Sequence, residues 1–357
     1  MSRRTATLVV SGLLLGGLVA VAALLPVPYV VFRPGPLTDV LGQGEDGPVI
    51  TAEGVPTYPT DGVLNLTTVG VTPAGARMDL LTAVQGWFDP ERAVVPRDVV
   101  YPGNPSTEEA RQVNAVEFAS SQDVASVAAL RYLGFEVPTE SNRVLVREVL
   151  PDGAAEGVLE PGDVILTVDG EPVSAPQAVV DAVSSTQPGQ PVPMRVERDD
   201  ETVELDVPTK PSQDDPDRAA IGVIVGPTWD LPVEVSIDVP GEIGGPSAGL
   251  VFTLGIIDTL TPEDLVAGAD VAGTGEISSD GTVGPISGVQ QKIAAARDGG
   301  GELFLVPRAN CGAADGANPG DMLLVPVETV DDAVDAIEAL RSGDAGTLPT
   351  CAEVGAV

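Results

Sequence analysis

The stretch Gly241-Glu-Ile-Gly-Gly-Pro-Ser-Ala-Gly-Leu250 places a serine where a glycine-rich loop runs into an apolar segment, Val251–Leu260. This segment is long enough for a buried helix, so we expect Ser247 at the entrance of that helix. The position exposes the hydroxyl and directs free backbone N–H groups, with the positive end of the helix, toward it. Serine is also a common N-cap residue, so the loop alone leaves a purely structural role for Ser247 open.

A lysine closes a second run, Gly281-Thr-Val-Gly-Pro-Ile-Ser-Gly-Val-Gln-Gln-Lys292. We expect Lys292 early in a helix over Val289–Arg297, where the residues that follow it are small or apolar. Burial lowers the pKa of a lysine, and a neutral amine can take a proton from a serine hydroxyl. The only other lysine, Lys210, begins a polar hinge over Lys210–Arg218, and we interpret it as a solvated linker charge.

The composition excludes several classes of chemistry. The chain has no histidine, which rules out Ser-His-Asp and Cys-His catalysis. The absence of imidazole and the presence of only two cysteines also disfavour the usual zinc sites, so we predict no metal. The 53 acidic and 18 basic residues give a formal charge of −35, which disfavours binding to nucleic acid. No Gly-x-x-x-x-Gly-Lys-Ser/Thr phosphate loop occurs, so we expect neither ATP nor another cofactor.

The two runs and a third motif between them, Thr274-Gly-Glu-Ile277, together resemble the proteolytic domain of the Lon family. The family carries its nucleophile in a Gly-Pro-Ser-Ala-Gly loop and its base in the lysine of the last motif. The resemblance implies Ser247 as nucleophile, Lys292 as general base and Thr274 as a hydroxyl that helps to hold the amine. The residues implied to support the nucleophile in its loop are Gly245, Pro246 and Ala248.

This resemblance covers about Ile221 to Leu340 and departs from the family pattern at two positions. Gly244 stands where many Lon proteases carry an acidic residue, and Ser287 replaces a glycine of the family. Lon-like domains often form hexamers, so the resemblance also implies a homo-oligomer.

A different pattern, short strands around one helix over Ala175–Ser184, fills the region from Tyr132 to Pro208. Its run from Gly157 to Val173, with Pro-Gly-Asp-Val-Ile-Leu followed by Val-Asp-Gly-Glu-Pro-Val, resembles the PDZ domains attached to bacterial proteases. Such modules add a peptide strand to a sheet edge and hold its C-terminal carboxylate. By resemblance, the carboxylate loop is formed by Leu133, Gly134 and Phe135. A purely structural PDZ module is the alternative. Histidine-dependent PDZ proteases are excluded by composition.

The N-terminus predicts a membrane anchor. Arg3 and Arg4 precede an uncharged stretch whose centre, Leu8–Leu25, is long enough to span a bilayer. The two arginines orient the N-terminus toward the cytoplasm and the remainder outside it. A cleaved signal peptide is the alternative, because Ala20-Val-Ala22 resembles a cleavage site.

Both interpretations place the body of the protein outside the cytoplasm. Disulfides persist in such compartments, so Cys311 and Cys351 are candidates for a disulfide. Two unpaired thiols are the alternative.

We therefore predict an α+β chain with one N-terminal transmembrane helix. A helix over Thr107–Leu133 is predicted to begin with a capping box of Ser106 and Glu109. Because a strand over Val63–Val69 could complete the catalytic domain, we favour a PDZ module inserted into that domain. The predicted division is anchor 1–33, a linker, strand and helix region 34–131, PDZ domain 132–209, Lon-like domain 219–341 and tail 342–357.

The function predicted from these features is an ATP-independent serine endopeptidase anchored in the cell membrane. Its substrates would be extracytoplasmic or membrane-proximal polypeptides, selected or delivered by the PDZ module. The alternative is a catalytically inactive PDZ scaffold that binds peptides at the membrane.

Overall fold

The computed structural model describes the chain except residues 1–2, 45–46, 139–140, 200, 213–214, 242 and 355–357. The side chains of residues 3, 6, 19–20 and 22–24 also lie outside the described part. The mixed α and β content of the described part agrees with the predicted fold class.

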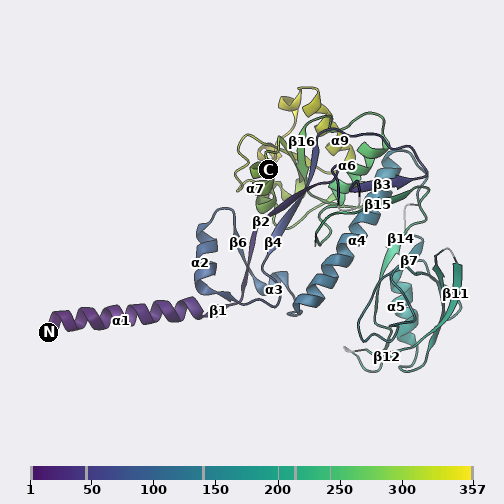
Figure 1. Ribbon diagram of the computed structural model, residues 1–357, viewed down its shortest axis with the longest axis horizontal. Helices are drawn as coiled ribbons and strands as arrows, with labels where there is room; N and C mark the ends of the chain where they lie inside the picture. The colour runs from purple at the N-terminus through teal and green to yellow at the C-terminus, as the bar shows by residue number, and fades with distance from the viewer. Residues whose placement is uncertain are drawn as a thin grey trace.

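A six-stranded mixed sheet forms the centre of the larger body (Figure 1). Its strand order is β20-β19-β16-β4-β2-β6. The strands are β2 (Tyr29–Asp39), β4 (Val63–Val71), β6 (Ala93–Pro96), β16 (Asp270–Gly273), β19 (Leu303–Pro307) and β20 (Leu323–Val327). β4 pairs in parallel with β16 and antiparallel with β2, so strands from both sides of the PDZ module share this sheet.

The segment Pro34–Pro59 is rich in Gly and Pro and begins the predicted linker region, but parts of it are incorporated into sheets. It contains the second half of β2 and all of β3 (Ile50–Glu53), which pairs with β15 (Glu234–Ile237). The register of β2 shifts between Pro34 and Leu37, which is how the sheet accommodates a Pro-Gly-Pro run.

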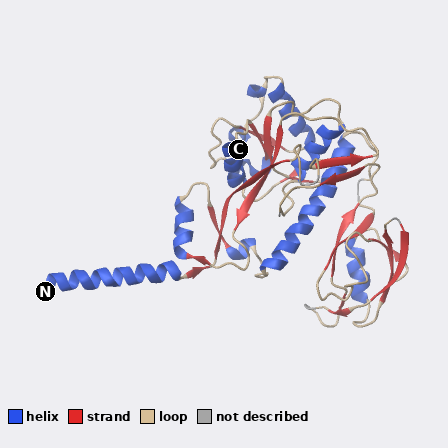
Figure 2. Cartoon of the chain, in the orientation of Figure 1, coloured by secondary structure: helices blue, strands red, loops and turns tan. Residues whose placement is uncertain are grey.

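The main helices of the larger body pack on strands of the central sheet or, in the case of the longest of them, on another helix (Figure 2). They are α4 (Thr107–Tyr132), α6 (Gly249–Leu260), α7 (Val289–Gly299) and α9 (Val330–Arg341). α6 is buried over nearly its whole length because its residues are almost all apolar, and it contributes much of the main core. The predicted capping box opens α4, and a second one, of Thr329 and Asp332, opens α9.

The PDZ module forms a separate sheet with its own apolar core. The strand order is β11-β10-β8-β7-β14, with β9 beside β8 and helix α5 (Pro176–Ser185) packed against the sheet. The strands are β7 (Arg143–Val149), β8 (Val164–Val168), β9 (Glu171–Pro172), β10 (Val192–Arg198), β11 (Glu201–Val207) and β14 (Val223–Thr228).

Strand β14 changes the expected boundary of the Lon-like domain at residue 219. It pairs antiparallel with β7 and therefore belongs to the PDZ sheet. The short pair β12 (Lys210–Pro211) and β13 (Ala219–Ala220) closes the hinge before it. The start of the Lon resemblance near Ile221 therefore coincides with a strand whose partner lies in the PDZ module.

The N-terminal part contains α1 (Arg3–Leu24), which extends away from the body of the molecule (Figure 1). Within the residues that the structure describes, no helix reaches the length and apolarity of a membrane span. The predicted transmembrane helix is therefore not found there. The elements that follow are β1 (Pro26–Val27), β5 (Met78–Asp79), α2 (Leu80–Phe88) and α3 (Arg97–Val100).

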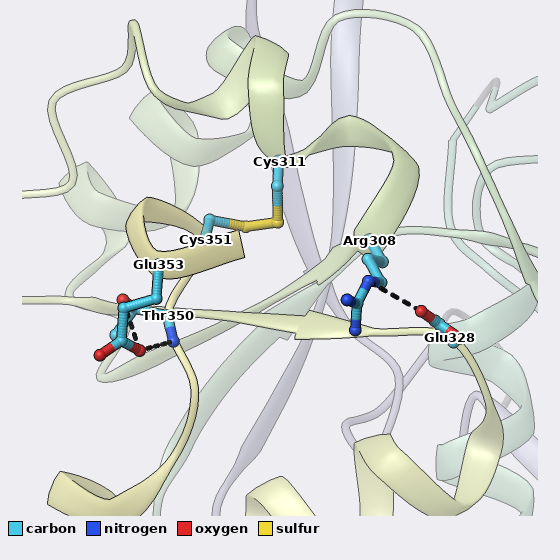
Figure 3. Close-up of a disulfide and its surroundings, with 6 residues drawn as sticks. All are labelled: Arg308, Cys311, Glu328, Thr350, Cys351 and Glu353. Atoms are coloured by element: carbon cyan, nitrogen blue, oxygen red, sulfur yellow. Dashed lines mark hydrogen bonds and ion pairs between the residues drawn. A yellow bond between two sulfur atoms is a disulfide. The ribbon is translucent and has the colours of Figure 1, made fainter. Parts of the chain in front are cut away.

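The C-terminal part is closed by a disulfide between Cys311 and Cys351 (Figure 3). The bond joins α8 (Cys311–Ala314) to α10 (Cys351–Val354) and ties the tail back to the domain. The two candidate cysteines are thus paired with each other. The remaining short elements are β17 (Glu276–Ile277), β18 (Val283–Gly284), η1 (Arg308–Asn310) and η2 (Ala345–Thr347).

Candidate active site

Ser247, Lys292 and Thr274 meet in one hydrogen-bonded group, although they come from three separate motifs. The Nζ of Lys292 lies 2.6 Å from the Oγ of Ser247 and 2.9 Å from the Oγ1 of Thr274. Thr274 in turn donates its hydroxyl to the backbone carbonyl of Ser247 at 3.0 Å. One threonine therefore fixes both the amine and the backbone that carries the serine.

The hydroxyl of Ser247 does not cap helix α6. The N-cap residue is Ala248, and it makes no side-chain capping bond. Ser247 lies one residue before it, half-buried, with its Oγ engaged by Lys292. The structural alternative for this serine, a simple N-cap, therefore does not describe its environment.

Lys292 is only 3 % exposed and sits in the first turn of α7, where its backbone N–H donates to Gly288. Most of its helix neighbours are buried as well. Burial lowers the pKa of the Lys292 amine to about 7, since the charged form loses its hydration. No ion-pair partner compensates the ammonium among the described residues. A substantial fraction of this lysine is therefore neutral near pH 7.

The loop that carries Ser247 is held from both sides. On one side, the N–H of Gly275 donates to the Ser247 carbonyl at 2.9 Å. On the other, helix α4 supplies Ser121, whose hydroxyl donates to the Pro246 carbonyl, and Asn114, whose carbonyl accepts from the Gly245 N–H. Sequence reasoning missed Ser121 and Asn114, because a single hydroxyl or backbone contact across more than 120 residues leaves no local pattern.

Backbone donors lie next to the serine hydroxyl. No described residue accepts a hydrogen bond from the N–H of Ser247 or of Ala248, whereas the next two N–H groups are bonded to Pro246 and Gly275. Both free groups lie at the entrance of α6, where the helix contributes partial positive charge. They are suitably placed to stabilise an oxyanion that forms at the serine.

The group opens into a cleft of about 520 Å³. One wall is the loop Ile243–Ala248 and another is the second half of β4. Glu117 of α4 and Glu276 of β17 also line it. Burial and the neighbouring Glu276 charge both raise the pKa of Glu117, so this carboxyl keeps its proton to higher pH than an exposed one. The parts of the chain that the structure describes contain no cluster of three or more potential metal ligands.

A second cavity, of about 300 Å³, lies in the PDZ module between α5 and the segment that leads into β14. Its walls are Val179 and Val183 on the helix and Arg218–Val223 on the other side. Gly222 there adopts a left-handed backbone conformation, with φ of +73°.

The predicted carboxylate loop does not border this cavity. Leu133 is the C-cap residue of α4, and Gly134 follows it with φ of +84°. Phe135 is the next residue along the chain and lies beside Arg131 instead. The prediction placed the loop at the start of the module, whereas the cavity is bordered by the segment that leads into β14, at the end of the module.

Comparisons with known proteins match the two bodies separately. The family model of the PDZ domain matches residues 131–209, and that of the Lon protease (S16) C-terminal proteolytic domain matches residues 233–338. The Lon protease of Phenylobacterium zucineum is 36% identical over 105 residues, which cover 28% of this chain and 13% of that protein. The Lon protease of Campylobacter concisus is 33% identical over 139 residues, which cover 38% of this chain and 17% of that protein.

Among solved structures, the PDZ domain of the SdrC-like protein from Listeria monocytogenes is 24% identical. The match covers 25% of this chain and 93% of the Listeria domain, with a TM-score of 0.23. The chain spans less than a fifth of the length of the two Lon proteases above. The chain therefore contains a PDZ domain, matched over residues 131–209, and a serine peptidase domain of the Lon type, matched over residues 233–338.

Proposed function

We propose that the chain is an ATP-independent serine endopeptidase in which Ser247 is the nucleophile and Lys292 the general base. The observation that carries the proposal is the 2.6 Å contact between Lys292 Nζ and Ser247 Oγ, made by a buried amine whose pKa is lowered to about 7. Such an amine can accept a proton from serine at neutral pH without a histidine. Thr274 acts as a positioning residue, since it contacts both partners.

In this mechanism the Ser247 oxygen attacks the peptide carbonyl carbon while its proton passes to Lys292. The free N–H groups of Ser247 and Ala248 stabilise the tetrahedral oxyanion, with about 3 kcal/mol typical for one such donor. The C–N bond then breaks as Lys292 returns the proton to the leaving amine, which leaves an acyl-serine. Water attacks the acyl group, Lys292 takes the water proton and passes it to the Ser247 oxygen, and a free carboxylic acid departs.

Cleavage of an unstructured protein by the full chain in detergent tests this function. We expect cleavage without added ATP, loss of at least 100-fold in Ser247→Ala, and a similar loss in Lys292→Arg, because arginine keeps the charge but cannot act as a base. ATP should change nothing, since the sequence contains no phosphate loop. An inactive PDZ scaffold, the competing function, would neither cleave nor react at Ser247 with a serine-directed acylating probe.

The PDZ module is proposed to select or deliver substrate through the cavity between α5 and β14. Apolar valines line the helix side, and Arg218 at its end offers a cation for a peptide carboxylate. Part of the Arg218 guanidinium already donates to Ser184 at 2.9 Å, which fixes its position. Val183→Lys should weaken binding of peptides with apolar C-termini, measured by fluorescence anisotropy, and leave cleavage of short peptides intact.

The location of the catalytic domain outside the cytoplasm is part of the same proposal. The disulfide supports it, because such bonds persist in oxidising compartments. Membrane attachment through α1 is supported by its exposed apolar side chains, among them Leu8, Leu13 and Leu18. Alkali extraction of membranes and labelling of introduced cysteines would test attachment and sidedness. Light scattering would test the homo-oligomer that the Lon resemblance implies.

A further inference from the structure

The segment that leads into helix α7 forms part of the cleft wall without being a helix or strand itself. This segment, Pro285–Gly288, directly follows the short strand β18. Ile286 and Ser287 of the segment line the cleft together with Lys292. Gly288 then caps α7 and accepts a hydrogen bond from the backbone N–H of Lys292 at 3.1 Å. The position of the segment therefore helps to set both this wall and the start of the helix that carries the base.

Asn310 holds the segment through both polar groups of its side chain. Its Oδ1 accepts the Ile286 N–H at 2.8 Å, and its Nδ2 donates to the Ile286 carbonyl, also at 2.8 Å. A side-chain amide presents a donor and an acceptor side by side, so it can bond to a backbone as a neighbouring strand would. Within the described residues, the Ile286 backbone has no other hydrogen-bond partner. Asn310 is only 8% exposed, so water does not readily replace these two bonds.

Asn310 is itself fixed by the rest of the domain. It ends η1, which directly follows strand β19 of the central sheet. The next residue, Cys311, is held by the disulfide (Figure 3). A second bond joins the same two parts of the chain, since the Gln290 side chain donates to the Ala313 carbonyl at 2.8 Å. The two bonds differ in one respect, because Ile286 lines the cleft and Gln290 does not.

We propose that Asn310 is a positioning residue for the peptidase reaction, which holds the cleft wall at Ile286 and thereby keeps the base Lys292 in place. This inference rests on the proposed peptidase function. Asn310 acts through the Ile286 backbone, to which both of its side-chain groups are bonded. A displacement of about 1 Å between reacting groups can cost about 100-fold in rate, so a loose wall slows the reaction. A loose wall also admits water to the Lys292 amine, and water favours the charged form.

The variant Asn310→Leu tests this role, because leucine has nearly the same shape and makes neither bond. The matched control is Gln290→Met, which removes the bond to Ala313 and leaves the cleft wall in place. The measurement is the rate of Ser247 acylation by a small fluorophosphonate at pH 7, with the full chain in detergent. We expect this rate to fall about tenfold in Asn310→Leu and to stay near the wild-type rate in Gln290→Met.

The pH dependence of the same reaction separates positioning from a general loss of stability. If water reaches the Lys292 amine in Asn310→Leu, the midpoint of the pH–rate profile moves to higher pH than in wild type. The other ionisable side chains that line the cleft, Tyr101, Glu117 and Glu276, are the same in both proteins. A shifted midpoint therefore reports on the surroundings of the lysine.

Hydrogen exchange in the unaltered protein gives an independent test, which holds even if Asn310→Leu does not fold. The bond to Asn310 should slow exchange of the Ile286 amide at least tenfold relative to the Ser287 amide, which has no partner in the part of the chain that the structure describes. Equal exchange of the two amides would overturn the inference alone.

The kinetic outcomes are equally distinct. Asn310→Leu with the wild-type acylation rate and midpoint would overturn the positioning role, and so would changes of equal size in Gln290→Met. A wild type that neither cleaves an unstructured protein nor reacts with the fluorophosphonate would overturn the proposed peptidase function instead.

Discussion

Lys292 Nζ and Ser247 Oγ lie 2.6 Å apart, although their residues are 45 positions apart in the chain. The contact depends on two helices, α6 and α7, whose first turns converge at the end of the central sheet. Thr274, which directly follows β16, completes the group by bonding to both the Lys292 amine and the Ser247 backbone carbonyl. The chemistry of the site therefore follows from where three elements of one sheet-and-helix body begin or end.

The first prediction concerns Thr274. Thr274→Val keeps the shape but loses the hydroxyl that accepts from Lys292 and donates to the Ser247 carbonyl. We expect kcat to fall about 10- to 100-fold with little change in KM, because small displacements of reacting groups are costly. The pKa of the pH–rate profile should also fall, since the ammonium form loses a hydrogen bond. Thr274→Ser should restore most of the activity, and an unchanged profile in Thr274→Val would contradict this positioning role.

The second prediction concerns Asp258, which is 1 % exposed near the end of α6 and has one carboxylate oxygen without a hydrogen-bond partner. Burial raises its pKa from 3.8 to about 6. Between about pH 4 and 6 the folded state therefore holds a proton that the unfolded state has lost, so stability falls as pH rises through this window. Asp258→Asn removes this ionisation.

Calorimetric or denaturant unfolding at pH 4.5 and pH 7.5 checks the Asp258 prediction. The free energy of unfolding of the variant, relative to wild type, should increase by about 2 kcal/mol from the lower to the higher pH. Wild type and Asp258→Asn with parallel pH dependence would show that the carboxyl is neutral or compensated throughout.

The third prediction concerns the disulfide, whose two cysteines are 40 residues apart. A crosslink closing a loop of this length is expected to stabilise the domain by about 3–4 kcal/mol through the unfolded chain. The double variant Cys311→Ala with Cys351→Ala should lose that amount in denaturant unfolding, and added reductant should destabilise wild type but not the variant. Equal sensitivity of both proteins to reductant would contradict a structural role for the bond.

The fourth prediction concerns the contact between the PDZ module and α4. Arg147 of β7 forms an ion pair with Asp123 of α4 and also donates to the Pro227 carbonyl at 2.9 Å. Burial raises the Asp123 pKa, and the Arg147 charge opposes that rise. Arg147→Met would leave the Asp123 carboxylate in place without its partner, at a cost of about 2 kcal/mol.

A double-mutant cycle with Asp123→Ala measures the energy of this pair. We expect the cost of Arg147→Met to be much smaller in the Asp123→Ala background. Additive costs would show that the two side chains are energetically independent.

Local patterns were sufficient to predict much of the fold. The capping box of Ser106 and Glu109 that opens α4 could be recognised because it needs only four residues. The glycine-rich approach to α6 and the lysine in α7 could be recognised because family motifs mark them. What failed depends on distant partners: β14 reads as a strand, but only the fold decides that it pairs with β7.

Two other features could not be predicted for related reasons. The Pro34–Pro36 run is typical of a linker, yet β4 holds it in a sheet through a register shift. The support of the nucleophile loop by Ser121 rests on one hydroxyl bond to Pro246, which no periodicity encodes. The cavity beside β14 also depends on which strand borders α5, and strand order is a property of the whole module.

The central claim is that neutral Lys292 activates Ser247, and the pH dependence of Ser247 acylation by a fluorophosphonate tests it most directly. Because burial lowers the Lys292 pKa to about 7, the amine loses its proton as pH rises through 7. The second-order rate of acylation should therefore increase with a single ionisation near pH 7 and reach a plateau above about pH 8. In Lys292→Arg, this step should disappear and the rate should fall at least 100-fold. A rate that is independent of pH between 5 and 9 in wild type, or the same ionisation in Lys292→Arg, would contradict the account.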